Sequence, residues 1–372
     1  MIRVVFAGGG TGGHVFPAVA IAERLMDANL SMYHTDGVDV MFVGTKNKIE
    51  ARVIPQLGYK FRTIWIGGFS RKFKLSNFLL PVKIIVSVFQ SLKLLLTYKA
   101  NVVVGTGGYV SGPVCAAAVV TRTPIILQEH NSYPGAMIRM FAPFAREIHI
   151  AFETSQKYFR LHRNLFVTGS PVRKMPRAKR EEALNYFGLS KGRQTLLVTG
   201  GSLGAVKLNS AVLGIVDDLI SRNYQLIWQT GSVDFERIRQ SFEKHPSMIY
   251  GRVEKFIERM DLAYSAADIA VCRGGATTIA ELISFNLPAV IIPYPYATAN
   301  HQVENARALV GSGAAVMVQE FEIEEKFKRE LLTLIDNPGQ LSVMREKMNG
   351  LLHDDAAEVI AKSVLRIAST NA

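Results

Sequence analysis

The sequence has very little cysteine: only Cys115 and Cys272 occur among its 372 residues. Neither cysteine belongs to a spacing that binds zinc, and two cysteines do not form a disulfide framework. The sequence therefore predicts a protein of a reducing compartment, without disulfides or structural zinc. We expect no bound metal and no cofactor.

A secretory leader and a membrane-spanning run are also missing from the pattern. The first apolar run, residues 2–7, is too short for a leader and continues directly into a glycine-rich loop. No segment approaches the roughly 20 apolar residues that a spanning helix needs. We therefore expect a protein that is cytosolic or lies on the inner face of a membrane.

Acidic residues are in deficit. The chain has 43 Lys and Arg against 31 Asp and Glu, a formal net charge of +12. This excess favours an anionic partner, which is nucleic acid, a phosphorylated ligand or an acidic membrane surface. No basic strand interleaved with aromatic residues of the RNA-binding type is present, so we expect no nucleic acid.

Two further absences concern the first glycine loop. The spacing Gly8-x-Gly10-x-x-Gly13 matches the dinucleotide fingerprint. The second predicted strand, residues 39–44, ends without the acidic residue that would hold a ribose, which argues against NAD or FAD. There is also no lysine of the P-loop type, so nucleotide hydrolysis is not expected.

Apolar runs of strand length alternate with helical patterns along the whole chain. This alternation predicts parallel, doubly wound α/β sheets, and the length suits two domains. The predicted strands are residues 3–7, 39–44, 101–105, 124–128, 147–151, 195–199, 224–229, 268–272, 289–293 and 315–318. Predicted helices of the first half are residues 17–29, 79–98 and 113–121.

The basic, proline-containing segment 169–180 interrupts this pattern and predicts a linker. We expect a first domain at residues 1–168 and a second at 169–349. The helical tail, about residues 350–372, is a candidate to pack back on the first domain.

Glycine motifs follow four predicted strands. They are residues 8–13, 105–112, 200–204 and 274–275. Glycines at a strand-to-helix turn permit close backbone approach, and the following helix offers free N–H groups, which together favour phosphate. Tight turns without a ligand are the alternative for any single loop.

Polar side chains beside these loops are candidates for chemistry. His14 begins a helix and suits a general base, or it only packs there. Glu129 and Asn131 follow a strand and either contact an acceptor or orient their loop. Arg273 can offset phosphate charge and Glu281 can accept ribose hydroxyls, although either could belong to a surface ion pair.

A helical segment after the strand at 289–293 carries His301, Gln302 and Asn305. The spacing places His301 and Asn305 on one helix face with Gln302 adjacent. Amides suit hydroxyl-rich sugars, and helix capping by Asn300 is the alternative.

Residues 79–98 are strongly apolar but carry Lys83 and Lys93, and residues 71–74 upstream are largely basic. An apolar helix with basic flanks can lie on anionic lipid. The alternative is a helix that covers the sheet. We expect lipid contact through Phe73, Ile84, Ile85 and Phe89, aided by Lys72 and Lys74.

In this order and combination, the motifs resemble the MurG family of bacterial peptidoglycan N-acetylglucosaminyltransferases. The matching motifs are residues 8–14, 107–112, 129–131, 169–173, 200–205, 273–281 and 301–306. The resemblance implies a GT-B fold, in which two Rossmann-like doubly wound domains flank a cleft. It implies an inverting transfer of N-acetylglucosamine from UDP-GlcNAc to the 4-hydroxyl of MurNAc in undecaprenyl-pyrophosphoryl-MurNAc-pentapeptide (lipid I), which gives lipid II.

The resemblance also assigns residues. The catalytic set is His14 as base, with Glu129 and Asn131. The UDP-GlcNAc set is Thr11, Gly12, Gly13, Asn131, Arg173, Ser202, Ile257, Arg273, Ala276, Thr277, Thr278, Glu281, His301, Gln302 and Asn305. The acceptor set is Gly10, Gly13, Gly107, Gly108, Tyr109 and Ser111.

Within the UDP-GlcNAc set, Ile257 would meet uracil through its backbone and Glu281 would hold the ribose. Leu203 and His130 depart from the family, which usually has glutamine at both positions. The implied location is the cytoplasmic face of the bacterial plasma membrane, with an anionic membrane surface and cell-wall synthesis proteins as partners. A related GT-B transferase with another lipid acceptor, or a basic nucleotide-binding module without enzymatic activity, is the alternative.

Overall fold

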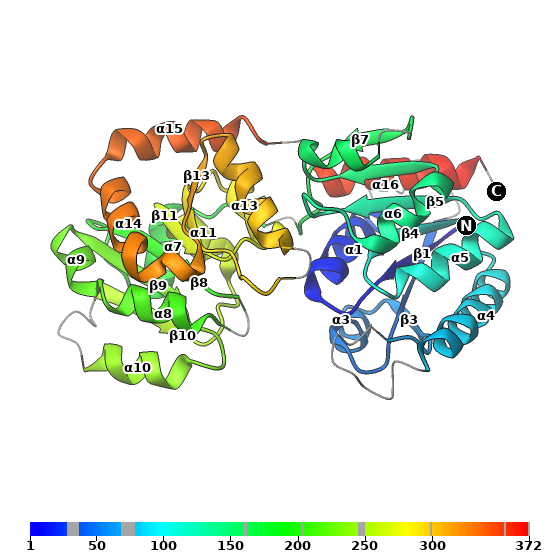
Figure 1. The fold of residues 1–372 in the computed structure, drawn as a ribbon, viewed down its shortest axis with the longest axis horizontal. Coiled ribbons are helices and arrows are strands. Elements are labelled where there is room, and N and C mark those ends of the chain that lie inside the picture. Colours follow the sequence, from blue (N-terminus) through cyan, green and yellow to red (C-terminus); the bar gives the residue numbers. More distant parts are fainter. Residues whose placement is uncertain are drawn as a thin grey trace. The chain divides into compact units, whose positions relative to one another are not determined.

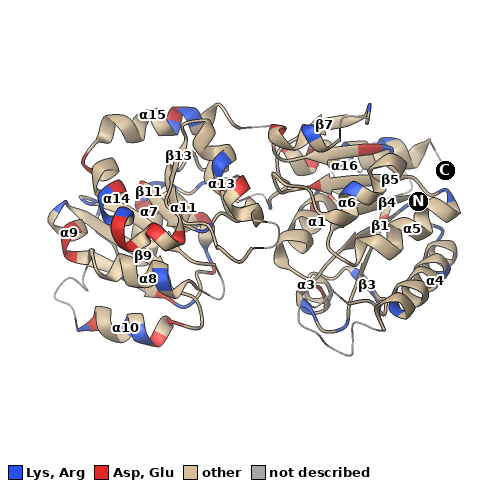
Figure 2. Ribbon diagram, in the orientation of Figure 1, with Lys and Arg blue, Asp and Glu red and all other residues tan. Residues whose placement is uncertain are grey.

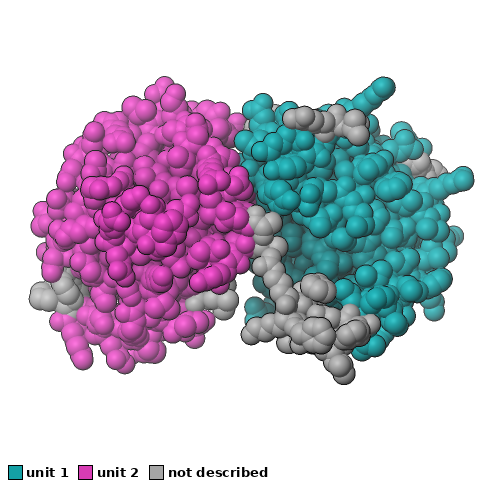
Figure 3. All heavy atoms as spheres, viewed as in Figure 1, with its two compact units in different colours: residues 1–174, 353–372 teal, residues 175–352 magenta. Residues whose placement is uncertain are grey.

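The computed structural model describes residues 1–27, 37–67, 79–159, 162–173, 175–201, 204–244, 250–297, 300–352 and 355–370. The chain divides into two compact units (Figure 3). Unit 1 is Met1–Lys174 together with His353–Ala372, and unit 2 is Met175–Leu352. The first stretch of unit 1 thus ends at residue 174 rather than 168, and unit 2 ends at 352 rather than 349.

Unit 1 is built on a seven-stranded sheet in the order β3-β2-β1-β4-β5-β6-β7 (Figure 1). All its strand pairs are parallel. The strands are β1 (Ile2–Gly8), β2 (Val38–Gly44), β3 (Lys60–Thr63), β4 (Val102–Gly107), β5 (Ile125–Glu129), β6 (Glu147–Ile150) and β7 (Leu165–Val167).

Helices cover both faces of this sheet, as the predicted doubly wound class requires. They are α1 (Gly12–Leu25), α3 (Ile49–Gln56), α4 (Leu80–Tyr98), α5 (Ser111–Thr121), α6 (Ala136–Phe141), η2 (Ala142–Phe144), η3 (Glu153–Tyr158) and α16 (Ala356–Ser369). One hydrophobic core joins the sheet to α1 and α16, and a second core lies under α5 and α6.

The late helix α16 belongs to unit 1, as the sequence suggested for the tail. Its apolar face, including Ile360, Val364 and Leu365, is buried in the same core as Val4 and Phe6 of β1. Figure 1 shows α16, drawn in red, among the blue and green elements of unit 1.

Unit 2 repeats the architecture with a six-stranded parallel sheet in the order β10-β9-β8-β11-β12-β13. Its strands are β8 (Gln194–Thr199), β9 (Tyr224–Gln229), β10 (Gly251–Glu254), β11 (Ile269–Cys272), β12 (Ala289–Ile291) and β13 (Ala315–Met317). Its helices are α7 (Arg180–Phe187), α8 (Val206–Leu213), α9 (Val216–Ser221), α10 (Phe235–Glu243), α11 (Met260–Ala266), α12 (Ala276–Ser284), α13 (His301–Gly311), η6 (Glu320–Glu322), η7 (Ile323–Phe327), α14 (Lys328–Ile335) and α15 (Pro338–Asn349).

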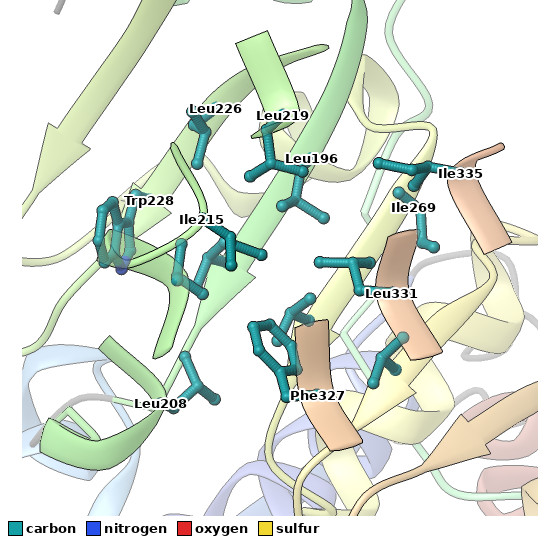
Figure 4. Close-up of a cluster of buried hydrophobic side chains, with 14 of the residues drawn as sticks. Leu196, Leu208, Ile215, Leu219, Leu226, Trp228, Ile269, Phe327, Leu331 and Ile335 are labelled. Carbon is teal, nitrogen blue, oxygen red and sulfur yellow. The ribbon is translucent and has the colours of Figure 1, made fainter. Parts of the chain in front are cut away.

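In the core of unit 2, side chains from the strands pack against side chains from the helices (Figure 4). Leu196 of β8 and Trp228 of β9 are fully buried together with Phe327 and Leu331. The continuous apolar strands of the sequence are therefore explained by burial on both sheet faces.

The strand orders place all four glycine motifs at equivalent points. In unit 1 the order reverses between β1 and β4, and in unit 2 it reverses between β8 and β11. The glycine loops follow these four strands. Ligands of open α/β sheets bind at this switch point, beyond the carboxyl ends of the strands.

Two expectations about helices are wrong. Helix α1 begins at Gly12 rather than Pro17, because the glycine loop itself supplies the first turn. Helix α4 spans 19 residues, and among the described residues it is the one helix that is long and apolar enough to cross a membrane by length and composition. Lys83 and Lys93 interrupt the apolar run, but the average hydropathy of α4 stays high enough for a membrane-spanning helix. Core helices of soluble proteins pass the same test.

Candidate active site

The two glycine loops of unit 1 are in direct backbone contact. Gly108 has φ +77°, and a Cβ atom there would lie 2.3 Å from the carbonyl oxygen of Gly9. A Cβ on Gly10, where φ is +89°, would lie 2.8 Å from Tyr109 Cε1. Only glycine permits this approach. The loops after β1 and β4 therefore form one continuous surface.

His14 is fixed between these loops. Its Nδ1 lies 3.0 Å from the carbonyl oxygen of Thr106, and the Thr106 hydroxyl donates to the His14 carbonyl over 2.8 Å. A carbonyl only accepts, so Nδ1 carries the proton in this arrangement. A neutral ring in this tautomer has Nε2 as its proton acceptor. A Cβ on Gly107 would lie 2.8 Å from His14 Nδ1, so this glycine makes room for the ring.

Glu129 orients its own loop. Its Oε1 accepts from the Asn131 backbone N–H (2.8 Å) and the Asn131 side-chain amide (3.1 Å), and its Oε2 accepts from the Gly135 N–H (2.7 Å). Burial raises the pKa of Glu129 to about 7, against the lowering effect of these bonds. The contacts favour the loop-orienting interpretation, and a catalytic role for Glu129 or Asn131 stays a prediction.

His130, which departs from the family pattern, packs edge-on against His14 with ring centroids 5.0 Å apart. Its Nε2 lies 3.1 Å from Asn131 Nδ2. His130 thus makes a polar contact to Asn131.

Other predicted residues of unit 1 lie at the same edge. Thr11, Gly12 and Gly13 form the start of α1, where the backbone N–H groups lack partners within the helix. The Ser111 hydroxyl donates to the Gly108 carbonyl over 2.8 Å, which steadies the second glycine loop.

Sequence reasoning missed Glu50. This carboxylate is 1% exposed and lies in the first turn of α3. It accepts from the Gly10 N–H (3.1 Å), the Thr45 N–H (3.1 Å) and the Thr45 hydroxyl (2.8 Å). The only signal in the sequence is an acidic residue five positions after Thr45, beyond the end of the second strand.

In unit 2, Glu281 of α12 is partly buried and accepts a 2.8 Å hydrogen bond from the Tyr264 hydroxyl. Burial raises the pKa of Glu281 to about 7, and the Tyr264 bond opposes that rise. Tyr264, which sequence reasoning also missed, therefore orients the carboxylate. Ala276, Thr277 and Thr278 form the first turn of the same helix, behind Gly275.

Arg273 holds the loop after β12. Its Nη1 donates to the carbonyls of Ile292 (3.0 Å) and Pro293 (3.3 Å), and its Nη2 pairs with Glu320 at 2.5 Å. Its predicted role at a phosphate stays a prediction, and the observed contacts are structural.

The three polar residues of α13, His301, Gln302 and Asn305, have different surroundings. Gln302 Oε1 accepts from the Tyr294 N–H over 3.0 Å, and its amide nitrogen is a hydrogen-bond donor. Asn305 is buried and donates to the Gly274 carbonyl over 3.2 Å. Asn305 thus fixes the glycine motif after β11, while His301 and Gln302 are partly exposed at the helix start.

The remaining donor-site predictions have mixed outcomes. The Ile257 N–H donates to Gln229 Oε1 over 2.9 Å, so its carbonyl oxygen is the backbone group that can meet a base. Arg173 belongs to unit 1 and pairs with Glu23 of α1. Ser202 and Leu203 lie outside the described residues.

Among the residues that the structure describes, no group of three or more His, Cys, Asp or Glu side chains could hold a metal ion.

The chain is similar to known glycosyltransferases over both units. Residues 4–150 match the glycosyltransferase family 28 N-terminal domain, and residues 195–360 match its C-terminal domain. A Chlorobium limicola protein is 41% identical over 372 residues, which cover 99% of this chain and all of that one. It is named UDP-N-acetylglucosamine--N-acetylmuramyl-(pentapeptide) pyrophosphoryl-undecaprenol N-acetylglucosamine transferase. The chain belongs to the MurG family of glycosyltransferases.

The fold agrees with this family. The crystal structure of Acinetobacter baumannii MurG matches 98% of this chain and all of that one, with a TM-score of 0.78 and 26% identity. The glycotransferase of kitacinnamycin matches 98% of this chain with a TM-score of 0.67 at 14% identity, which shows the fold alone. The GT-B class expected for a MurG family member is confirmed.

Proposed function

We propose that this chain is the inverting transferase that moves N-acetylglucosamine from UDP-GlcNAc to the 4-hydroxyl of MurNAc in lipid I, giving lipid II. The observation that carries the proposal is the 41% identity over nearly the full length to a relative with this named activity. The fold alone would not suffice, because GT-B-like folds serve many reactions.

Unit 2 is the proposed donor site. The Ile257 carbonyl accepts from uracil N3–H, since its own N–H is used by Gln229. Glu281 accepts the ribose hydroxyls. The N–H groups of Ala276, Thr277 and Thr278 face the diphosphate at the positive end of α12.

The sugar of the donor meets α13. The amide nitrogen of Gln302 and the side chain of His301 read its hydroxyls, while Asn305 acts through the Gly274 loop. Ser202, Arg173 and Arg273 remain proposed diphosphate contacts.

Unit 1 is the proposed acceptor site and holds the base. His14 Nε2 takes the proton from the MurNAc 4-hydroxyl as its oxygen bonds to the anomeric carbon. The bond between that carbon and UDP breaks on the opposite face, which inverts the linkage. The loops 8–13 and 107–112 contact the acceptor pyrophosphate.

The test measures UDP release from UDP-GlcNAc with lipid I, with diacylglycerol and with no acceptor. Release only with lipid I supports the proposal, and release with diacylglycerol alone would assign the chain to another acceptor. In His14→Ala we expect most of kcat to be lost, with the calorimetric Kd for UDP-GlcNAc unchanged. Normal turnover in that variant would remove His14 from the role of base.

We further propose that unit 1 binds an anionic membrane surface from the cytoplasmic side through α4. Ile84, Ile85 and Phe89 are 45%, 58% and 66% exposed. Figure 2 shows basic but no acidic residues on α4, and Lys83 lies over the exposed ring of Trp65, 5.7 Å from its centroid. An exposed apolar face with cations and a tryptophan suits the lipid headgroup region. Phe73, Lys72 and Lys74 lie outside the described residues.

A further inference from the structure

Glu50 is an unusual residue to find behind a loop that is expected to meet an anion. It is a buried carboxylate, and no cation is recorded among its partners in the described part of the chain. A buried charge of this kind is retained only where donors satisfy it. Here three donors and the N-terminal end of α3 do so.

The donors come from separate loops. Gly10 belongs to the loop after β1, and Thr45 follows β2. Tyr109 of the loop after β4 interacts with both Thr45 and Glu50. Glu50 therefore joins three neighbouring loops at the switch point of the sheet.

The space around Glu50 shows how tightly the loop is held. A Cβ on Gly9 would lie 2.8 Å from Glu50 Oε1, and a Cβ on Gly44 would lie 2.5 Å from Glu50 Cγ. The Gly9 carbonyl in turn touches Gly108, and a Cβ on Gly108 would lie 3.1 Å from His14 Cδ2. A short chain of contacts thus runs from Glu50 to the imidazole.

We infer that Glu50 is a positioning residue, which fixes the glycine loop and, through it, His14 and the acceptor contacts. Because the Gly10 N–H donates to Glu50, Gly10 anchors the loop and does not bind the acceptor pyrophosphate. The N–H groups at the start of α1, at Gly12 and Gly13, are the ones directed to an anion. The inference rests on the proposed function for its kinetic consequences.

The decisive variant is Glu50→Gln. It keeps the size of the side chain, but its NH2 group must face an N–H donor of Gly10 or Thr45. We expect the acceptor kcat/KM to fall about ten- to a hundredfold, as loss of a charge-assisted hydrogen bond implies. The calorimetric Kd for UDP should stay unchanged, because the proposed contacts at Ile257, Glu281 and the start of α12 lie in unit 2. Glu50→Asp keeps the charge and should recover part of the loss, and Glu153→Gln, an exposed carboxylate of unit 1, should match the wild type.

Amide hydrogen exchange gives a readout that does not depend on activity. In the wild type the Gly10 amide should exchange slowly, and in Glu50→Gln its exchange should accelerate together with that of residues 9–14. If the wild type releases no UDP with lipid I, the proposed function fails, while the exchange comparison still decides the role of Glu50.

Unchanged acceptor kinetics and unchanged Gly10 exchange in Glu50→Gln would overturn the inference. An equal loss of UDP affinity would also overturn it, since the effect would then not be confined to unit 1. Should Glu50→Gln not fold, Thr45→Val removes one donor and leaves both backbone donors. It should show the same acceptor-specific loss to a smaller degree, and wild-type kinetics in Thr45→Val would contradict the inference.

Discussion

At the scale of single residues, three buried or partly buried carboxylates shape the site, and each is held by hydrogen-bond donors. Glu50 and Glu129 accept from backbone N–H groups, and Glu281 accepts from a tyrosine hydroxyl. A carboxylate held in this way is positioned by the loop or helix around it. In Glu129 and Glu281, burial also raises the pKa to about 7.

The first prediction concerns the pH dependence of nucleotide binding. The pKa of Glu281 is raised to about 7 by burial. Only the ionised carboxylate accepts both ribose hydroxyls without offering a proton of its own. UDP affinity should therefore increase as pH rises through 7 and level off above it, with a limiting slope of about tenfold per pH unit below the pKa.

Isothermal titration of UDP between pH 5.5 and 8.5 measures this dependence. Glu281→Gln should bind UDP weakly and lose the slope near pH 7. A wild-type affinity that is flat across this range would place the ribose elsewhere.

The second prediction concerns Tyr264. In Tyr264→Phe the carboxylate of Glu281 loses its 2.8 Å donor. We expect UDP binding to weaken by about 1 kcal/mol, the usual net value of one hydrogen bond. Tyr186→Phe, at an exposed tyrosine of the same unit, is the matched control in calorimetry. Equal affinities in the two variants would show that Tyr264 does not orient Glu281.

The sequence was sufficient to select some candidate site residues, but not the residues that form hydrogen bonds with them. His14 and Glu281 could be selected because each stands beside a glycine motif. Glu50, Tyr264, Thr106 and Gln229 could not, because each acts through a contact between segments far apart in the chain. Arg273 was selected for a role at a phosphate, but it contacts Glu320 and two backbone carbonyls. The sequence around Arg273 does not reveal these contacts, because the partners lie 19 to 47 residues away.

At the scale of elements, α4 has an inverted distribution of side chains. Its buried residues are Ser87, Ser91 and Leu95. The two serine hydroxyls donate to carbonyls of their own helix, at Ile84 and Ser87. Small, internally satisfied side chains thus let α4 pack closely in unit 1 beside Leu95, while Ile84, Ile85 and Phe89 are exposed.

The third prediction follows from this inversion. The double variant Ile85→Asn and Phe89→Asn should lower binding to vesicles containing anionic lipid by at least about tenfold, because two apolar side chains no longer enter the lipid. Its Tm should stay close to the wild-type value, since both positions are exposed.

Vesicle flotation measures the binding, with neutral vesicles as the reference. Leu95→Ala, at a buried position of the same helix, should do the opposite: it should lower the Tm and leave flotation unchanged. Equal, negligible flotation of the wild type with both vesicle types would reject membrane binding through α4.

The strands that the sequence did not predict are all at sheet edges or next to solvent. They are β3, β7 and β10, and each is terminal in its sheet. Their residues alternate between partly buried and exposed, as in the Lys60–Thr63 strand. An edge strand needs no continuous apolar run, so the pattern that identified the central strands is absent there.

At the scale of the whole molecule, the chain passes from unit 1 to unit 2 and back again. The return brings α16 onto α1 and the sheet of unit 1, where Ile360 and Val364 are fully buried. Unit 1 is therefore completed by a segment that follows unit 2 in the sequence.

The fourth prediction tests this closure. Ile360→Ala should destabilise unit 1 by about 2–4 kcal/mol, as expected for a large-to-small change in a core. Amide hydrogen exchange, measured on peptide fragments, should accelerate in α1, β1 and α16 and not in unit 2. The Kd for UDP should stay unchanged. Val343→Ala, at an exposed position of α15, is the control. Uniform acceleration across both units would show that they unfold as one.

The placement of α16 also bears on how the nascent chain folds. The ribosome makes the strands of unit 1 first, yet the core that holds Val4, Phe6 and the neighbouring α1 is completed only by residues 356–369. Unit 2 carries its whole core within one uninterrupted stretch and can be finished earlier. We therefore expect the apolar surface of β1 and α1 to be incompletely buried, and prone to aggregation, until residues 356–369 are available to pack on it.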